Sequence, residues 1–200
     1  QLVELPGWKP SVTAPALARL DISPLRSLIQ IEADGAAFEV TRYDVEEAVR
    51  AGDNFTERRV LRRLTHQPAP GGFVVVDMTA DTEPDIVVPT VDGLLFIISG
   101  TGDMPVESPL PTLGSVLSAP AVGAARDRLE LAVRTTRGDV VRWLVTGRVE
   151  DLAWESAGHD RSNANNAEVP LPTREVGGLG LTEPPRFPPN TPCSCTSVNG

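Results

Sequence analysis

The chain has 200 residues, of which 40% are hydrophobic and only 4% aromatic, and a formal net charge of −9. This length fits one domain with flanking segments, whose core must be built from Val, Leu, Ile and Ala. The acidic balance argues against nucleic acid as the main partner, because phosphate binding needs clustered Lys and Arg. No apolar run approaches the length of a membrane helix, so no membrane span is expected.

Proline and glycine divide the chain into three parts. Residues 1–15 contain three prolines and are predicted to form an extended N-terminal arm, with Trp8 anchored in a pocket. Residues 16–155 are predicted to form a β-rich globular domain. Residues 156–200 are rich in Pro, Gly and Asn and cannot form a core of their own, so we expect a C-terminal arm that another surface holds in place.

The predicted domain begins with strands and continues into a short two-helix insertion. Strands are expected at 16–22, 25–32 and 37–41, and the insertion at about 44–66. The first helix of the insertion is expected to have a capping pair at its start and to end at a glycine; these residues are Asp44, Glu47 and Gly52.

The second helix of the insertion is predicted from a repeat of the same capping spacing, at Asn54 and Glu57. It is expected to run to about His66, with an apolar face made of Val60, Leu61 and Leu64. Four arginines on this helix form a possible basic patch, although a solvated face paired with acidic residues is the expected alternative. They are Arg58, Arg59, Arg62 and Arg63.

The strongest strand signals lie between Phe73 and Ser99. Residues 73–78 and 86–91 are apolar and rich in β-branched side chains, and Asp92-Gly93 predicts a two-residue type I′ hairpin to a strand at 94–99. Pro89 cannot donate a ladder hydrogen bond, which places its strand at a sheet edge. The strand that follows the hairpin is apolar on both parities, so we expect it to be buried on both faces.

A second hairpin is expected near the end of the domain. Residues 128–136 alternate between apolar and polar, and a turn at 136–139 leads to a partner strand at 140–149, followed by a helical turn or another strand at 149–155. With seven or eight short strands in all, the sequence predicts a β-rich fold, all-β or α+β, with a sandwich-like domain.

Three short motifs have both a chemical and a structural interpretation. Arg137-Gly138-Asp139 resembles an integrin-binding tripeptide, but Gly and Asp are also what a turn requires. Asn54 begins a formal N-glycosylation sequon, but the same residue is expected to cap a helix. Four carboxylates crowd one loop and have the oxygen ligands of a hard-cation site, although a solvated acidic loop is the expected structure. They are Asp77, Asp81, Glu83 and Asp85.

No catalytic, cofactor-binding or metal site is predicted, and we expect the chain not to be an enzyme. The only histidines are His66 and His159. Cys193 and Cys195 are too close in sequence for an unstrained disulfide, so free thiols are expected. The glycine-rich segment 99–103 lacks the lysine of a phosphate-binding loop.

The arms are the main functional signal. Proline-rich arms with apolar side chains predict a structural subunit that contacts copies of itself or other structural subunits, most consistent with a viral capsid or coat-type protein of a virion. The chain begins with Gln1, which fits a segment of a longer precursor. Two alternatives stay open: an extracellular binding or adhesion domain, and a subunit or fragment of a multi-chain enzyme. The expected assembly contacts are Trp8, Val169, Leu171, Val176, Leu179, Leu181 and Phe187.

Overall fold

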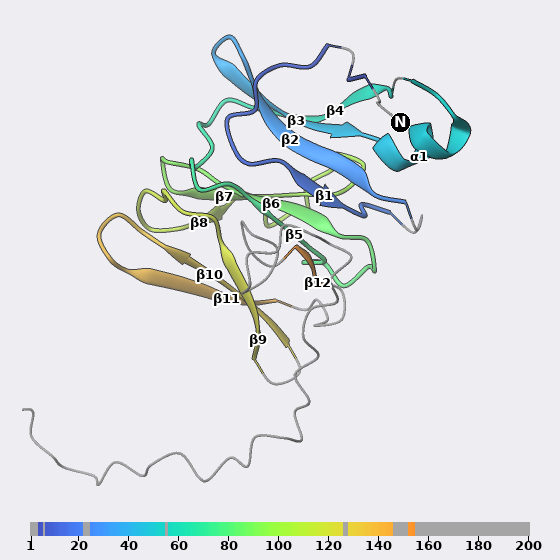
Figure 1. The fold of residues 1–200 in the computed structure, drawn as a ribbon. Helices are drawn as coiled ribbons and strands as arrows, with labels where there is room; N and C mark the ends of the chain where they lie inside the picture. The colour runs from blue at the N-terminus through green and yellow to red at the C-terminus, as the bar shows by residue number, and fades with distance from the viewer. Residues whose placement is uncertain are drawn as a thin grey trace, which may run out of the picture. The chain divides into compact units, whose positions relative to one another are not determined.

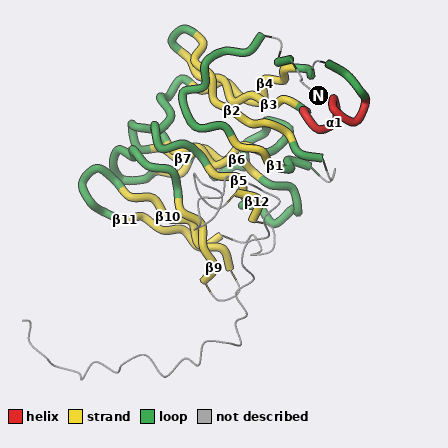
Figure 2. The backbone as a smooth tube through the Cα atoms, viewed as in Figure 1, coloured by secondary structure: helices red, strands yellow, loops and turns green. Residues whose placement is uncertain are grey.

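The computed structural model describes residues 4–145, except 6, 22–24, 55 and 126–127, together with a strand at 152–154. The chain divides into two units, Gln1–Val169 and Pro170–Gly200, and every described residue belongs to the first. The described residues form twelve strands in three antiparallel sheets and one helix (Figure 1, Figure 2). The predicted β-rich class is therefore confirmed. The predicted C-terminal arm at 156–200 lies outside the described residues.

Each sheet is named here by its number of strands. The four-stranded sheet has the order β1 (Ala16–Ala18), β2 (Ser27–Asp34), β3 (Ala37–Tyr43) and β4 (Arg58–Leu64). The five-stranded sheet has the order β12 (Leu152–Trp154), β5 (Val74–Val76), β6 (Asp85–Pro89), β7 (Leu94–Ile98) and β8 (Leu110–Pro111). The three-stranded sheet has the order β11 (Val140–Val145), β10 (Arg128–Arg134) and β9 (Ala121–Ala125).

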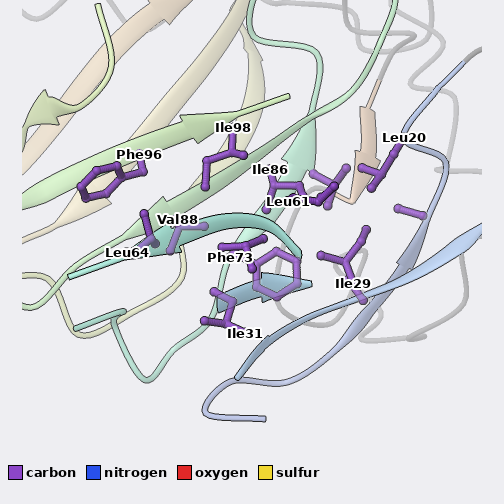
Figure 3. Packing of buried hydrophobic residues seen from close by; sticks show 14 residues of the cluster. Leu20, Ile29, Ile31, Leu61, Leu64, Phe73, Ile86, Val88, Phe96 and Ile98 are labelled. Atoms are coloured by element: carbon purple, nitrogen blue, oxygen red, sulfur yellow. The ribbon is translucent and has the colours of Figure 1, made fainter. Parts of the chain in front are cut away.

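The five-stranded sheet contributes to both hydrophobic clusters of the molecule. Successive strand residues point to opposite faces, and both parities of β5, β6 and β7 are apolar. One face packs with side chains of the four-stranded sheet, including Val40 and, as Figure 3 shows, Ile29 and Ile31. The other face packs with side chains of the three-stranded sheet, Leu129, Leu131 and Val133. The expected burial of the 94–98 strand on both faces is confirmed, whereas a sandwich-like domain is not, because the strands form three sheets.

The predicted two-helix insertion is not confirmed, because it contains one helix and one strand. Helix α1 (Val45–Ala51) ends at Gly52, which has the positive φ of a helix C-cap. Asp44 occupies the N-cap position but makes no capping bond, since its carboxylate accepts hydrogen bonds from Ser27 and Arg42.

The second predicted helix is strand β4. A β-bulge lies opposite Val40 and Thr41, which pair with Arg62 and Val60, so that Leu61 has no partner in the register. The extra residue brings Leu61 and Leu64 into the same core cluster at a spacing of three. This spacing imitates a helical apolar face, which explains why the sequence pattern was misleading.

The β6–β7 hairpin is present, but its loop has three residues rather than two. Thr90 N–H donates to Leu94 O (2.8 Å) and Gly93 N–H donates to Thr90 O (3.2 Å). Gly93 has a φ of +91° and Asp92 has no positive φ, so the type I′ prediction is wrong. The edge prediction from Pro89 is also wrong, because β6 lies between β5 and β7 and Pro89 is its last residue, where its carbonyl accepts Ala69 N–H.

Candidate functional site

The outer face of the four-stranded sheet carries a buried cluster of charged and polar side chains. We call it the Glu32 cluster; its members are Gln30, Glu32, Glu39, Thr41, Tyr43 and Arg58. Glu32 is fully buried at its centre. Its Oε1 accepts hydrogen bonds from Gln30 Nε2 (2.6 Å), Tyr43 OH (2.9 Å) and Thr41 Oγ1 (3.2 Å).

Arg58 joins the two carboxylates of the Glu32 cluster. Its Nη2 donates to Glu32 Oε2 and to Glu39 Oε2, both at 2.6 Å, and its Nε donates to Glu32 Oε2 at 3.1 Å. Burial alone would raise the pKa of Glu32, but hydrogen bonds from Arg58, Gln30 and Tyr43 outweigh it and hold this pKa below its usual value. The Arg58 guanidinium likewise lowers the pKa of Glu39. Both carboxylates are therefore ionised at neutral pH.

The N-terminal segment crosses this face. Glu4 exchanges backbone hydrogen bonds with Asn54 and Thr56 near the start of β4, and Val12 N–H donates to Ile31 O (2.7 Å) on β2. Between them, Lys9 Nζ binds Asp34 Oδ1 (2.8 Å) and Glu39 Oε2 (3.2 Å). The segment thus covers polar side chains of its own sheet.

Trp8 does not lie as the sequence suggested, and the four arginines lie on strand β4 rather than on a helix. Trp8 is 54% exposed, so it is not the pocket anchor that we expected. Arg58 belongs to the Glu32 cluster, Arg59 pairs with Asp44 (3.7 Å) and Arg63 pairs with Asp34 (2.6 Å). Arg62 also lies on β4 and is partly buried. Three of the four arginines therefore form ion pairs with acids of the same chain, which is the alternative considered above.

The acidic loop 77–85 is organised by its own carboxylates. Asp77 is buried and accepts backbone N–H groups of Thr79 (3.1 Å), Ala80 (2.6 Å) and Thr82 (2.9 Å). Asp85 is also buried and accepts Met78 N–H (2.9 Å). A shallow cleft of about 290 Å³ separates this loop from 99–105. Within the described part of the chain, no three His, Cys, Asp or Glu side chains are arranged to hold a metal ion.

Replacing Asp85 with asparagine is expected to stabilise the protein at pH 7. Burial raises the pKa of Asp85 to about 6, and the nearby carboxylates of Asp81 and Asp77 add to this shift. A raised pKa means that folding favours the protonated form of Asp85. The contribution of Asp85 to folding stability is therefore fully present below its unfolded-state pKa and is lost as the pH rises through about 6. Asparagine cannot ionise and keeps an oxygen for Met78 N–H.

The expected gain for Asp85→Asn at pH 7 is on the order of 2 kcal/mol. Urea unfolding at a series of pH values measures it. The wild type should lose stability relative to the variant between about pH 4 and pH 6. Asp103→Asn, which removes an exposed carboxylate of the same cleft, serves as the control and should change little. Parallel stability curves for Asp85→Asn and the wild type would contradict the expectation.

The two remaining motifs, at Asn54 and at Arg137–Asp139, lie in exposed turns or bends, and His66 lies in a partly buried bend. Arg137-Gly138-Asp139 forms the tip of the β10–β11 hairpin, where the guanidinium of Arg137 donates to Leu113 O and lies 3.5 Å from the Asp139 carboxylate. His66 Nδ1 pairs with Asp92, and its ring lies 5.5 Å from that of Phe96. Asn54 is exposed, but it follows α1 and caps no helix.

The outer face of the three-stranded sheet carries exposed apolar side chains, whereas that of the four-stranded sheet carries the buried Glu32 cluster. We call it the β9–β11 outer face; it carries Ala121, Gly123, Glu130, Ala132, Arg134, Val140, Arg142 and Leu144. Val140 is 61% exposed and Leu144 is 65% exposed, and no described residue covers them. The opposite face holds Leu129, Leu131 and Val133 in the core. Among the described residues, the N-terminal segment therefore covers a polar sheet face, while Val140 and Leu144 on the β9–β11 outer face stay exposed.

The β9–β11 outer face is also hollowed on one side. A hollow of about 200 Å³ is lined by Ala121, Val122, Gly123, Glu130 and Ala132. Beside it, Glu130 Oε1 and Arg142 Nη1 form an ion pair at 2.7 Å. This face was not predicted from the sequence, although the run Val140–Val145 was a signal. Apolar residues on one face of a strand are enough to fill a core, so the remaining apolar residues of this run lie on the outer face.

Comparison with known proteins gives no further direction. No family model matches the chain, and no curated protein or solved structure matches it either. The helix among the described residues is too short and too polar to cross a membrane.

Proposed function

We propose that this chain is a non-enzymatic structural subunit of a larger assembly, of viral capsid or coat type and located in a virion. The observation that carries the proposal is the β9–β11 outer face, where Val140 and Leu144 stay exposed. Exposed apolar side chains that share one sheet face favour a contact site there, because each side chain gains free energy when a partner removes it from water. Stacking of sheets face to face, as in a sandwich-like fold, is the same mode of contact.

Terminal arms supply further contacts in this proposal. Trp8 is exposed on the N-terminal segment and is suited to a pocket on a neighbouring subunit, since interface hot spots are enriched in Trp. The apolar residues of 156–200 are proposed as a second set of contacts. Prolines lower the entropy lost when such a segment docks. The partners are copies of the chain or other structural subunits.

The native mass of the purified chain tests the proposed function. We expect light scattering to show an assembly well above the 21.3 kDa monomer, and removal of residues 156–200 to reduce its mass. The truncation leaves every described residue in place, so circular dichroism should report an unchanged fold. A monodisperse monomer for both chains at all concentrations would overturn the proposal and favour a binding domain instead.

A further inference from the structure

We propose that the N-terminal segment is a salt-sensitive strap, which opens from the outer face of the four-stranded sheet while the rest of the domain stays folded, and that Lys9 holds it closed. The strap is defined here as residues 4–12. This inference goes beyond the proposed function, because it concerns a single chain and needs no association between copies. It adds a conformational change that ionic strength controls.

The strap has almost no hydrophobic attachment to the sheet. None of its described residues is buried, and its apolar side chains Trp8 and Val12 are exposed. Leu5 is partly buried but belongs to neither hydrophobic cluster. Segments with few buried apolar contacts open at a much lower free-energy cost than the core does. The strap can therefore leave the sheet without opening either cluster.

Backbone hydrogen bonds attach the two ends of the strap. At the first end, Glu4 N–H donates to Asn54 O (2.6 Å) and Thr56 N–H donates to Glu4 O (3.2 Å). At the second end, Val12 N–H donates to Ile31 O (2.7 Å). A single hydrogen bond contributes little net stability, since water offers the same groups alternative partners. Neither end is therefore held firmly by itself.

An interruption in the pairing separates the strap from β1. Ser11 lies opposite Glu32, and pairing resumes with Ala16 opposite Ile29. Residues 12–15 thus face only residues 30–31 of β2, which leaves the strap side with extra chain that cannot join a regular ladder. Ala16 belongs to the core cluster and is buried. Opening should therefore stop at this interruption and leave β1 in its sheet.

Lys9 attaches the middle of the strap. Its Nζ binds Asp34 Oδ1 (2.8 Å) and Glu39 Oε2 (3.2 Å), and these hydrogen bonds raise the pKa of Lys9 above its usual value. Lys9 is also the only lysine in the chain. Through its two carboxylates it joins a network of three carboxylates and two guanidinium groups, to which it supplies the missing positive charge. The members are Glu32, Asp34, Glu39, Arg58 and Arg63.

The position of the strap makes its opening consequential. A Cβ at Gly7 would lie 3.5 Å from the Cδ of Arg58, so the strap passes directly over this network. Opening uncovers Arg58 and Glu39 and frees Trp8. The pair of Arg58 and Glu32 forms within the sheet, so it persists and the domain stays folded.

Ionic strength controls the opening because the ion pairs of Lys9 are partly exposed. The side chains of Lys9 and Asp34 are 35% and 31% exposed. Salt screens such pairs strongly, whereas it leaves backbone hydrogen bonds and buried apolar contacts largely unchanged. Raising the salt concentration should therefore favour the open strap without unfolding the domain.

Amide hydrogen exchange of the full chain, followed by NMR, tests the opening. The Thr56 and Val12 amides report the two ends of the strap, and ladder amides of β6 report the core. After correction for intrinsic rates, Thr56 and Val12 should exchange at similar rates, at least about a hundredfold faster than the β6 amides. Both should exchange faster as the salt concentration rises from about 0.02 M to about 0.5 M.

Substitutions at Lys9 test its role. Lys9→Met keeps the length of the side chain but removes its charge, so both strap amides should exchange about two- to fivefold faster at low salt and lose most of their salt dependence. Lys9→Arg keeps the charge and should behave as the wild type does. Arg142→Met, which removes the same charge from an ion pair with Glu130 on the three-stranded sheet, is the matched control and should leave the strap amides unchanged.

Three results would overturn the inference. The first is a Val12 amide that stays as protected as the core while Thr56 exchanges, which would mean that only the chain end frays. The second is exchange of the strap and β6 amides at one common rate, because the strap would then open only when the domain unfolds. The third is equal exchange in Lys9→Met and the wild type, because Lys9 would then not hold the strap closed.

Discussion

Replacing Arg58 with alanine is expected to lower the free energy of unfolding by about 3–5 kcal/mol. The reason is the position of Glu32, which is fully buried and receives two hydrogen bonds from this guanidinium. Without Arg58, the carboxylate keeps its neutral donors, Gln30 and Tyr43, but loses the only positive charge that the described contacts bring to it. A buried charge without a counter-ion is among the most costly changes in a folded protein.

The matched control is Arg63→Ala on the same strand. Arg63 also pairs with one carboxylate, Asp34, but its side chain is 60% exposed. Exposed ion pairs contribute about 0–1 kcal/mol, so this variant should unfold almost as the wild type does. Chemical denaturation of both variants measures the difference. Equal losses of unfolding free energy in the two variants would contradict this expectation, because the buried pair of Arg58 and Glu32 would then matter no more than an exposed pair.

The pH dependence separates loss of charge pairing from loss of packing. In the wild type the pKa of Glu32 is below its usual value, so its contribution to stability exists above that value and is lost as the pH falls through the lower, folded-state pKa. In Arg58→Ala, burial is opposed only by neutral donors, which raises the pKa of Glu32. Protonation then relieves the variant, and its deficit should shrink as the pH falls below about 5.

Replacing Gly102 with alanine is expected to cost about 3 kcal/mol or more. Gly102 has a φ of +97°, and a Cβ at this residue would lie 2.2 Å from the carbonyl oxygen of Leu61. The backbone strain and the clash with another strand add to each other. Because the contacted atom is backbone, it cannot turn away as a flexible side chain would.

The matched control for Gly102→Ala is Gly138→Ala. Gly138 has nearly the same φ, +91°, but a Cβ there meets nothing within 4 Å. Its substitution therefore carries the strain alone, which we estimate at about 1 kcal/mol. Thermal and urea unfolding of the two variants should differ by the cost of the clash. If the two alanine variants unfold alike, the close approach to Leu61 has no energetic consequence.

Much of the fold follows from local sequence patterns. The hairpin at 136–139 was predicted because its turn residues and flanking strands are contiguous in the chain. Burial on both faces was predicted for 94–98 because two-sided apolarity is visible in the residues themselves.

The misses have non-local causes. The bulge in β4 depends on its pairing with β3, and no residue of β4 alone reveals it. The glycines of segment 99–103 were considered for a phosphate loop, whereas Gly100 and Gly102 lie where the backbones of Leu20 and Leu61 pass close by. Assignment of strands to three sheets also depends on contacts between distant segments, as in the pairing of β12 with β5. The β9–β11 outer face was missed for the same reason, since exposure of Leu144 depends on which parity of β11 faces the core.

The two-sided burial of β6 has a consequence for strand alignment. A slip of one residue usually moves apolar side chains into water, and this penalty fixes the pairing of a half-buried strand. In β6, Ile86, Val87 and Val88 would exchange faces and still be buried. The apolar pattern therefore does not select the alignment, and the polar ends of the strand must do so. Thr90 binds Leu94 through its hydroxyl as well as its backbone, and Asp85 at the other end accepts Met78 N–H, so both ends are held in place.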